Sequence, residues 1–462
     1  MERSKMESGV DEREEEGRVV VLVPYPFQGH MTPMLQLGHA LHSKGFSVKI
    51  AHTQFNPPTP SHHPNLSFHN LADDGDDIPI DDVTQRLKSI CDMNENCRVP
   101  LREYLEKLGD DVRCVVIYDN LMYYAGHVAS LLRLPSVVMR PFSALFSLFV
   151  VHLLQHGDSL LPLPESKLED AIPGLDLLRY KDIPPYMNSE EAKYFMSISM
   201  DIGSSVAIIW NTVEGLEQKW LSRLQQLYKV PIFPTGPFHK FSITPTNTSF
   251  LEEDTSCLSW LDKQAPRSVL FVSASGSIAE VEQGDFAEIA RGLAHSGHPF
   301  LWAIRPGSIK GMECKEGEME DLERRMGERG RIVKWAPQKD VLAHGSVGGF
   351  WSHCGWNSTM EALGEGVPMI CRPVLADQFT NARFLVQELR VGLELKELER
   401  GVIAETVREL MGEGDERDKL KKNAMEMKRK LDDSFKRDGS SHRALNELAH
   451  FISSLPRCEP RM

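Results

Sequence analysis

The feature that most limits the possible folds of this chain is a strand–turn–helix pattern that occurs once in each half. In the first half, the apolar run 19–27 leads through residues 28–30 into a helix that begins near Thr32. In the second half, the apolar run 268–272 is followed by a turn of small residues, 273–277, and an amphipathic helix. Continuous apolar strands that alternate with amphipathic helices are typical of parallel sheets. The pattern predicts an α/β fold of two Rossmann-like, doubly wound domains that face each other across a cleft.

Chain length and local composition indicate the domain boundaries. A chain of 462 residues is too long for one ordinary core, so we expect two domains of roughly 200 residues each. The polar, turn-rich segment 239–254 is the predicted linker between an N-terminal domain, 18–238, and a C-terminal domain, 255–439. The charged segment 1–17 predicts a disordered tail. The last segment, 440–462, predicts a helix with an apolar face, and one hypothesis is that it packs back on the N-terminal domain.

A helix start in the stretch 335–378 suits a diphosphate. An apolar strand, 348–352, runs through His353 into a turn and a new helix, where free backbone N–H groups attract anions. Asn357 and Ser358 stand at that helix start and add side-chain hydrogen bonds. Because ligands bind at the carboxyl ends of parallel strands, we expect this turn to line the cleft.

Other residues of the same stretch suit a base and two sugars. Trp335 offers a flat ring on which a base can stack. Glu361 lies one turn into the new helix, where a carboxylate can accept two ribose hydroxyls. Asp377 and Gln378 follow the next strand and offer polar atoms to a second sugar. The stretch therefore predicts a site for a nucleotide diphosphate sugar.

This stretch resembles the signature of the plant secondary-product UDP-glycosyltransferases, whose members share a GT-B fold. It matches at the Trp, Ala-Pro-Gln, His-Cys-Gly-Trp-Asn-Ser, Glu and terminal Asp-Gln positions, at the length of that signature. The segments 24–37, 172–184 and 233–237 also resemble the family, so the likeness covers nearly the whole chain. The start of the chain and GERGRIVKWAPQ are most similar to the subgroup that includes steviol-glycoside and benzoxazinone glucosyltransferases.

The resemblance implies a role for each matching residue in holding UDP-glucose, which is the expected co-substrate. Trp335 would stack on uracil, Ala336 would contact it through its backbone, and Gln338 and Glu361 would hold the ribose. The phosphates would be held by His353, Asn357, Ser358 and Ser277, and the sugar by Trp356, Asp377 and Gln378, with Ser143 as a further candidate. A terminal Gln in this signature is usual for glucose donors, whereas His there favours galactose.

His30 is the expected general base. Transfer to a hydroxyl needs a group that removes its proton, and His30 follows a strand end, where its ring can reach the cleft. Asp119 ends the apolar strand 114–118, another carboxyl end of the same sheet, and suits the carboxylate that orients the imidazole. Both residues also match the catalytic pair of the resembled family, which implies an inverting reaction that gives a β-glucoside.

Three segments depart from the family pattern. The turn 273–277 is one residue longer than the usual Val-Ser-Phe-Gly-Ser form, so it must bulge or shift its register. Pro141-Phe142-Ser143 stands where a Thr-Ser-Ser-like stretch is common, which leaves the sugar contact to Ser143 alone. The charged segment 312–329 lacks the usual Leu-Pro-x-Gly-Phe and is interpreted as a solvated loop or helix.

Three alternatives remain open from the residues. Asp74-Gly75-Asp76 formally matches the DxD site of a metal-dependent glycosyltransferase, although its acidic surroundings are typical of a solvated turn. An NAD-dependent oxidoreductase is disfavoured because no GxGxxG follows a strand. A non-catalytic protein that binds a UDP-sugar or another small molecule is supported only by the lengthened turn 273–277. We expect no metal and no further cofactor.

Composition bears on location and partners. The formal net charge of −14 disfavours nucleic acid and anionic membranes as partners. The charged N-terminus lacks the apolar core of a signal peptide, and the eight cysteines show no CxxC spacing, so we expect free thiols in a cytoplasmic monomer. The segment 142–154 is rich in Phe and Leu and predicts a lipophilic acceptor, such as a phenolic, flavonoid or terpenoid.

Overall fold

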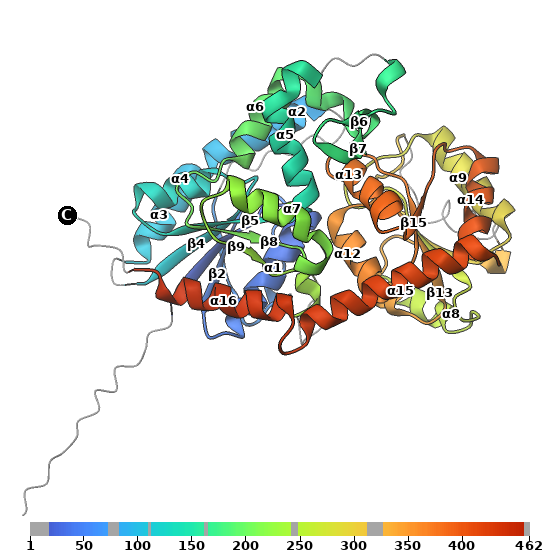
Figure 1. Ribbon diagram of the computed structural model, residues 1–462. Coiled ribbons are helices and arrows are strands. Elements are labelled where there is room, and N and C mark those ends of the chain that lie inside the picture. Colours follow the sequence, from blue (N-terminus) through green and yellow to red (C-terminus); the bar gives the residue numbers. More distant parts are fainter. Residues whose placement is uncertain are drawn as a thin grey trace, which may run out of the picture.

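The computed structural model describes residues 18–72, 83–109, 112–160, 165–241, 248–311 and 327–456. The expected tail 1–17, the Asp74-Gly75-Asp76 motif and most of the segment 312–329 lie outside these ranges. The described residues form two parallel sheets, each with its own helices (Figure 1). The α/β prediction is therefore confirmed.

The N-terminal sheet has seven strands in the order β3-β2-β1-β4-β5-β8-β9, and every neighbouring pair is parallel. Its strands are β1 (Val19–Val23), β2 (Ser47–His52), β3 (Ser67–Asn70), β4 (Cys114–Asp119), β5 (Ser136–Arg140), β8 (Ala207–Trp210) and β9 (Ile232–Pro234). Its helices are α1 (Gln28–His42), α2 (Val83–Asn96), α3 (Arg98–Lys107), α4 (Tyr124–Leu131), α5 (Ala144–Leu160), α6 (Glu190–Met200) and α7 (Glu214–Leu227). A small antiparallel hairpin of β6 (Ala171–Ile172) and β7 (Leu175–Arg179) extends from this domain.

The C-terminal sheet has six parallel strands in the order β12-β11-β10-β13-β14-β15. Its strands are β10 (Val269–Ser273), β11 (Phe300–Ala303), β12 (Gly330–Val333), β13 (Val347–Ser352), β14 (Met369–Cys371) and β15 (Gly392–Glu394). The helices around it are α8 (Ser256–Leu261), α9 (Gln283–Ser296), α11 (Gln338–Ala343), α12 (Trp356–Glu365), α13 (Gln378–Arg383), α14 (Arg400–Met411) and α15 (Asp415–Phe435).

The central strands of both sheets are buried on both faces, as their uninterrupted apolar runs require. Val20 and Val21 of β1 point to opposite faces of the first sheet and are both inaccessible to solvent. They belong to different hydrophobic clusters, one on each side of the sheet. Phe271 of β10 and Phe350 of β13 stack in the second sheet, with ring centroids 5.1 Å apart. Helices on both faces therefore leave the carboxyl ends of the strands as the accessible parts of each sheet.

The last helix, α16 (Ser440–Ser454), leaves the C-terminal domain and lies on the N-terminal sheet. Figure 1 shows α15 and α16 running one after the other along the lower edge of both domains. Leu445, Leu448 and Ile452 of α16 are buried in the cluster that contains Val20. The apolar face expected from the sequence is covered by this packing.

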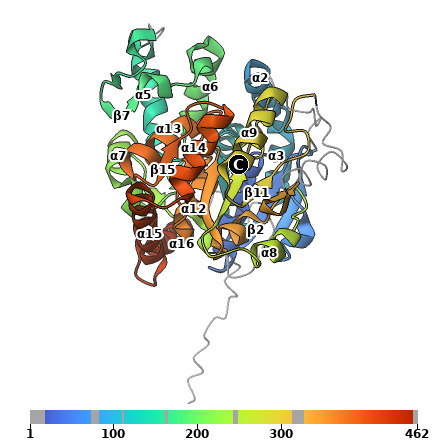
Figure 2. The same cartoon turned by 90° about the vertical axis from the view of Figure 1, so that its right-hand side faces the viewer.

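Three buried polar contacts join the domains near α13. The Arg383 guanidinium forms two hydrogen bonds of 2.9 Å with the Asp182 carboxylate, and both side chains are only 8% exposed. Tyr186, a few residues further along the same segment, bonds the backbone N–H of Ala376 at 3.1 Å. Ser143, just before α5, bonds Asn381, and α13 lies beside α5 when the molecule is viewed from its C-terminal domain (Figure 2). The N-terminal domain therefore contacts the segment that carries Asp377 and Gln378.

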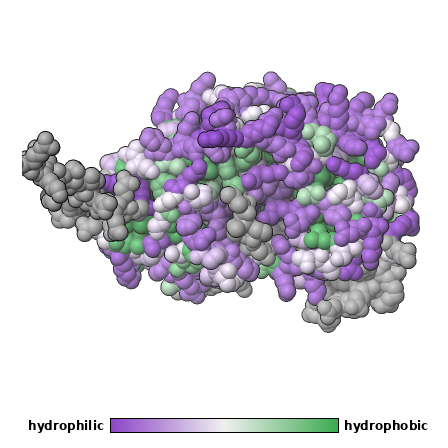
Figure 3. Space-filling model, turned by 90° about the horizontal axis from the view of Figure 1, so that it is seen from below, coloured by the Kyte–Doolittle hydropathy of each residue, from purple (hydrophilic) through white to green (hydrophobic). Residues whose placement is uncertain are grey.

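The face seen in Figure 3 is largely hydrophilic, with hydrophobic residues in scattered areas. Within the described ranges, no helix combines the length and the apolar character needed to cross a membrane.

We expect Arg383→Ala to lower the free energy of unfolding by about 3 kcal/mol, because the Asp182 carboxylate would stay buried without its partner. Urea or thermal unfolding measures this change. Arg429→Ala is the matched control, since Arg429 and Asp433 form an exposed pair at 3.3 Å, and it should leave the melting temperature almost unchanged. Equal losses of stability in the two variants would show that the interdomain ion pair contributes no more than an exposed pair.

Candidate active site

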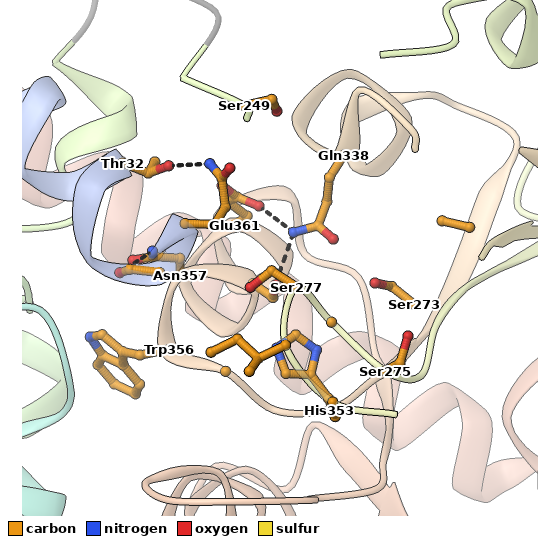
Figure 4. Close-up of a pocket in the computed structure, with 18 of the residues that line it drawn as sticks. Thr32, Ser249, Ser273, Ser275, Ser277, Gln338, His353, Trp356, Asn357 and Glu361 are labelled. Carbon is orange, nitrogen blue, oxygen red and sulfur yellow. Dashed lines mark hydrogen bonds between the residues drawn. The ribbon is translucent and has the colours of Figure 1, made fainter. Parts of the chain in front are cut away.

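A cavity of about 360 Å³ lies between the two domains, at the carboxyl ends of both sheets (Figure 4). Most of the residues predicted for the site line this cavity: His30, Ser277, Trp335, Ala336, Gln338, His353, Trp356, Asn357, Ser358, Glu361, Asp377 and Gln378. Two do not line it, since Asp119 lies behind His30 and Ser143 lies in the interdomain contact. The fold thus brings residues from both halves of the chain to one place.

His30 and Asp119 meet because β1 and β4 are neighbours in the sheet. Asp119 is the last residue of β4, and His30 lies in the first turn of α1, directly after β1. The His30 Nδ1 and Asp119 Oδ2 atoms are 2.8 Å apart, and the other oxygen of Asp119 accepts the backbone N–H of Leu121 at 2.9 Å. A carboxylate at Nδ1 places the ring proton there and leaves Nε2 as an acceptor. His30 is 21% exposed and Asp119 is fully buried, so the pair can take a proton from a molecule in the cavity.

Gln338 orients the carboxylate of Glu361. Its side-chain amide donates to Glu361 Oε2 at 2.7 Å and to Ser358 Oγ at 2.9 Å. Burial raises the pKa of Glu361, while the Gln338 amide opposes this shift by stabilising the ionised form. Trp335, on the same side of the cavity, is held by a hydrogen bond of 3.1 Å from its indole N–H to Ser249. This side of the cavity offers a flat ring and an oriented carboxylate.

His353 lies just before α12 and is enclosed by two glycines, one in the turn after β10 and one at the start of α12. A Cβ atom added at Gly276 would lie 2.6 Å from His353 Nε2, and one added at Gly355 would lie 2.5 Å from it. Burial lowers the pKa of His353 to about 4, so the ring is neutral near pH 7 and can offer a hydrogen bond but no charge. Cys354, the next residue, has a φ of 65°, which turns the chain from β13 into the helix.

The lengthened turn after β10 is accommodated by Gly276. This residue has a φ of 57°, a left-handed conformation that an L-residue adopts only with strain. The turn keeps Ser273, Ser275 and Ser277 on the cavity wall. In Figure 4, Ser277 lies between Gln338 and His353. The extra residue therefore changes the local path of the chain without removing Ser277 from the site.

In the loop before α13, three consecutive backbone N–H groups donate hydrogen bonds to side-chain oxygens. Gln378 Oε1 accepts the N–H groups of Val374 and Leu375, both at 2.9 Å, and Tyr186 accepts that of Ala376. Because this oxygen is engaged, Gln378 can present only its Nε2 donor to a ligand. Asp377 follows in the same loop, and burial raises its pKa to about 6, against opposing effects of Asn381 and the nearby His30.

Several predicted donor residues also make contacts within the protein. Trp356 donates its indole N–H to the Asn211 carbonyl at 2.6 Å, and Asn357 donates to the Gly29 carbonyl at 2.8 Å. These bonds join the domains at the base of the cavity. They leave the ring face of Trp356, rather than its N–H, for contact with a ligand.

Ser143 requires a correction. Its hydroxyl donates to Asn381 Oδ1 at 2.9 Å and accepts the N–H of Phe146 at 3.2 Å, and its side chain is fully buried. The geometry therefore does not support the expected contact of Ser143 with the donor sugar. Tyr186 and Asn381 were missed by the sequence reasoning. The spacing of four residues between Asp377 and Asn381 was a usable signal, since such residues share one helix face.

Comparison with solved structures defines the class of the protein. The chain aligns with UGT2 of Phytolacca americana, solved with UDP-2fluoro-glucose and pterostilbene, at a TM-score of 0.78 and 28% identity, over 95% of this chain and 100% of that one. Two facing parallel sheets of this kind define a glycosyltransferase of the GT-B fold, as the sequence resemblance implied.

Sequence comparison then identifies the family. The family described as UDP-glucoronosyl and UDP-glucosyl transferase matches residues 68–434. UDP-glycosyltransferase 76E1 of Solanum lycopersicum is 52% identical over 95% of this chain and 93% of its own length. Flavonol 3-O-glucosyltransferase UGT76E12 of Arabidopsis thaliana is 41% identical, over 95% and 97%. The chain belongs to this family of plant UDP-glycosyltransferases, and the prediction of a sugar-transferring enzyme is confirmed.

We expect Gly276→Ala to destabilise the protein by about 1–2 kcal/mol from backbone strain alone, with a further loss from its collision with His353. Gly284→Ala is the matched control, because Gly284 lies in α9 with open space around the position of its Cβ atom. It should leave stability unchanged or raise it slightly. Thermal unfolding compares the two variants, and equal melting temperatures would contradict the tight fit around His353.

Proposed function

We propose that the protein is an inverting glucosyltransferase that transfers glucose from UDP-glucose to a hydroxyl of a lipophilic small molecule and gives a β-glucoside. The observation that carries this proposal is His30, which is bonded to Asp119 and lines the same cavity as Trp335, Glu361 and Asp377. A base for the acceptor and a set of groups for the donor therefore share one space. The cytoplasmic location and monomeric state expected from the sequence are part of the proposal.

The reaction is a single displacement in which His30 acts as the general base. The acceptor hydroxyl gives its proton to His30 Nε2 while its oxygen forms a bond to C1 of glucose. The bond between C1 and the β-phosphate oxygen breaks, and UDP leaves with the electron pair of that bond. Asp119 stabilises the imidazolium that forms. Attack opposite the leaving group converts an α-linked donor into a β-glucoside.

The donor is assigned to the C-terminal wall of the cavity. Trp335 stacks on uracil, whose edge contacts the Ala336 backbone, and Gln338 and Glu361 hold the ribose. The diphosphate is held at the start of α12 by His353, Asn357, Ser358 and Ser277. Partial positive charge at a helix start stabilises the leaving diphosphate, so the proposal includes no metal. The donor analogue bound to the Phytolacca americana enzyme supports this assignment.

The sugar is assigned to the loop before α13. Asp377 accepts hydrogen bonds from glucose hydroxyls, Gln378 donates one from Nε2, and Trp356 packs against the ring. This division of roles follows from the engagement of Gln378 Oε1 by the loop backbone. A hydrogen-bond donor at residue 378 is consistent with the resemblance, in which Gln at this position is usual for enzymes that use a glucose donor.

The acceptor is assigned to the aromatic side of the cavity near His30. Tyr25 packs edge-on against the His30 ring with centroids 5.1 Å apart, and it stacks with Phe27 at 5.0 Å. Phe27 in turn contacts Phe55. Of these four Tyr and Phe rings, Phe142 lines the cavity, and the other three are not among its lining residues. Aromatic walls favour flat, apolar acceptors with a hydroxyl group. The name of the Arabidopsis thaliana relative, a flavonol glucosyltransferase, supports the same choice.

We expect His30→Ala to abolish nearly all transfer and Asp119→Asn to lower kcat by about 100-fold or more, while both variants still bind UDP. Steady-state kinetics and calorimetry measure the two properties separately. His344→Ala is the matched control, because His344 also contacts an aspartate, Asp262 at 3.2 Å, but lies away from the cavity. Turnover of His30→Ala at the wild-type rate would overturn the assigned base.

We expect UDP-glucose to be the best donor in a screen of phenolic, flavonoid and terpenoid acceptors read by mass spectrometry. UDP-galactose and UDP-xylose test the role of Gln378, and NMR of the product tests for the β-anomer. Activity should persist with EDTA, and its loss would favour the metal-dependent alternative. If single-turnover mixtures with every acceptor release no UDP, the non-catalytic binding protein becomes the better interpretation.

A further inference from the structure

Asn381 is a fully buried amide that touches the sugar side of the cavity without lining it. It lies on α13, four residues after Asp377. Its Nδ2 donates to Asp377 Oδ2 at 2.7 Å and to the Cys354 carbonyl at 3.0 Å. Its Oδ1 accepts the Ser143 hydroxyl at 2.9 Å. One amide therefore joins the loop of Asp377, the turn before α12 and the N-terminal domain.

The orientation of this amide is determined by its neighbours. Both N–H groups face oxygen atoms that can only accept, namely a backbone carbonyl and an ionised carboxylate. The Ser143 oxygen already accepts the N–H of Phe146, so its own proton is directed to Asn381. A flipped amide would place its oxygen against the Cys354 carbonyl and the Asp377 carboxylate, which is repulsive. The Cys354 carbonyl and the Asp377 carboxylate thus fix the side of Asn381 that faces Asp377, and the Ser143 hydroxyl complements this orientation.

The contact also bears on the charge of Asp377. Burial raises the pKa of this carboxyl to about 6, and the Asn381 amide opposes the shift because it stabilises the ionised form. The titratable groups that face Asp377 are His30 from α1, Tyr186 from the N-terminal domain, and Cys354 from the turn before α12. Asn381 is not titratable, and it donates a side-chain hydrogen bond to this carboxylate.

We propose that Asn381 is a positioning residue for the donor sugar, which holds Asp377 in the orientation that accepts hydrogen bonds from the sugar hydroxyls. This inference rests on the proposed UDP-sugar function, in which Asp377 contacts the sugar. Oδ2 is bonded to Asn381 and Asp377 lines the cavity, so in this proposal Oδ1 is the oxygen that accepts from the sugar hydroxyls. The N-terminal domain contributes through Ser143, which bonds Asn381 and does not itself contact the donor.

The test compares the affinities of UDP and UDP-glucose by calorimetry in wild type, Asn381→Ala and Asn381→Asp. The change in the ratio of the two affinities between variants isolates the contribution of the sugar, because the extra charge on the terminal phosphate of UDP is the same in every comparison. We expect UDP affinity to stay within about twofold, whereas the ratio falls by about tenfold or more because a charge-assisted hydrogen bond is lost. The isosteric Asn381→Asp should lose at least as much, since it places a second carboxylate beside Asp377. A ratio that both variants retain would overturn the inference.

The dependence on pH gives a second measurement. In the wild type, the ratio should fall as pH drops through about 6, where Asp377 gains a proton. In Asn381→Ala the fall should occur at higher pH, because the pKa of Asp377 rises when its hydrogen-bond donor is removed. A packing defect at α13 would lower stability without moving this midpoint, so an unmoved midpoint would count against the inference.

Two further variants separate positioning from general damage. Ser143→Ala removes the bond across the domains but keeps the bond between Asn381 and Asp377, and it should change the ratio by less than about threefold. An equal loss in Ser143→Ala would assign the effect to domain docking instead. In an Asp377→Ala background, Asn381→Ala should cause no further loss in the ratio, because its target is gone. Additive losses would contradict the inference.

The same measurements, together with the donor screen, distinguish a wrong choice of donor from a wrong inference about Asn381. If wild type transfers galactose or xylose but not glucose, the choice of glucose is wrong, and the affinity ratio for that other UDP-sugar then tests Asn381. If wild type shows a sugar contribution that the Asn381 variants keep, the donor assignment stands and this inference is wrong.

Discussion

The active site depends on a small number of buried polar contacts that hold two separate parallel sheets against each other. Hydrophobic packing builds each sheet and its helices and also crosses the boundary, where Trp220 packs on Phe384 and α16 lies on the N-terminal sheet, and the polar contacts add direction to it. The ion pair between Asp182 and Arg383 and the bonds of Tyr186 and Trp356 have directional requirements that apolar contacts lack. They place His30 of the first domain opposite cavity residues of the second. The catalytic geometry is therefore a property of the interface more than of either domain.

Much of the fold and donor site could be predicted from sequence because each of those features is local. A strand end places the following side chain at the edge of a parallel sheet, and this placement together with the family resemblance led to the pairing of His30 with Asp119. The donor stretch was recognisable because its spacing spans one strand–turn–helix unit and the strand after it. Its outline required no knowledge of how the two domains dock.

The remainder of the site could not be predicted because it depends on distances across the domain boundary. Ser143 was a reasonable sugar contact on its sequence position, yet docking brings Asn381 within reach of its hydroxyl first. Gln378 looked like a group with two free polar atoms, but one atom holds its own loop. Tyr186 follows a segment that already resembled the family, and nothing in its residue type indicated that it would meet Ala376.

The path of α16 has a consequence for how the two domains can move. The chain crosses the boundary between them twice, once after β9 and once between α15 and α16, and Ser441 at the start of α16 bonds the Gly236 carbonyl at 2.7 Å. The two crossings therefore lie side by side. Any motion that widened the cleft about this side would have to break the polar contacts near α13. The two chain crossings would keep the halves joined while those contacts were broken.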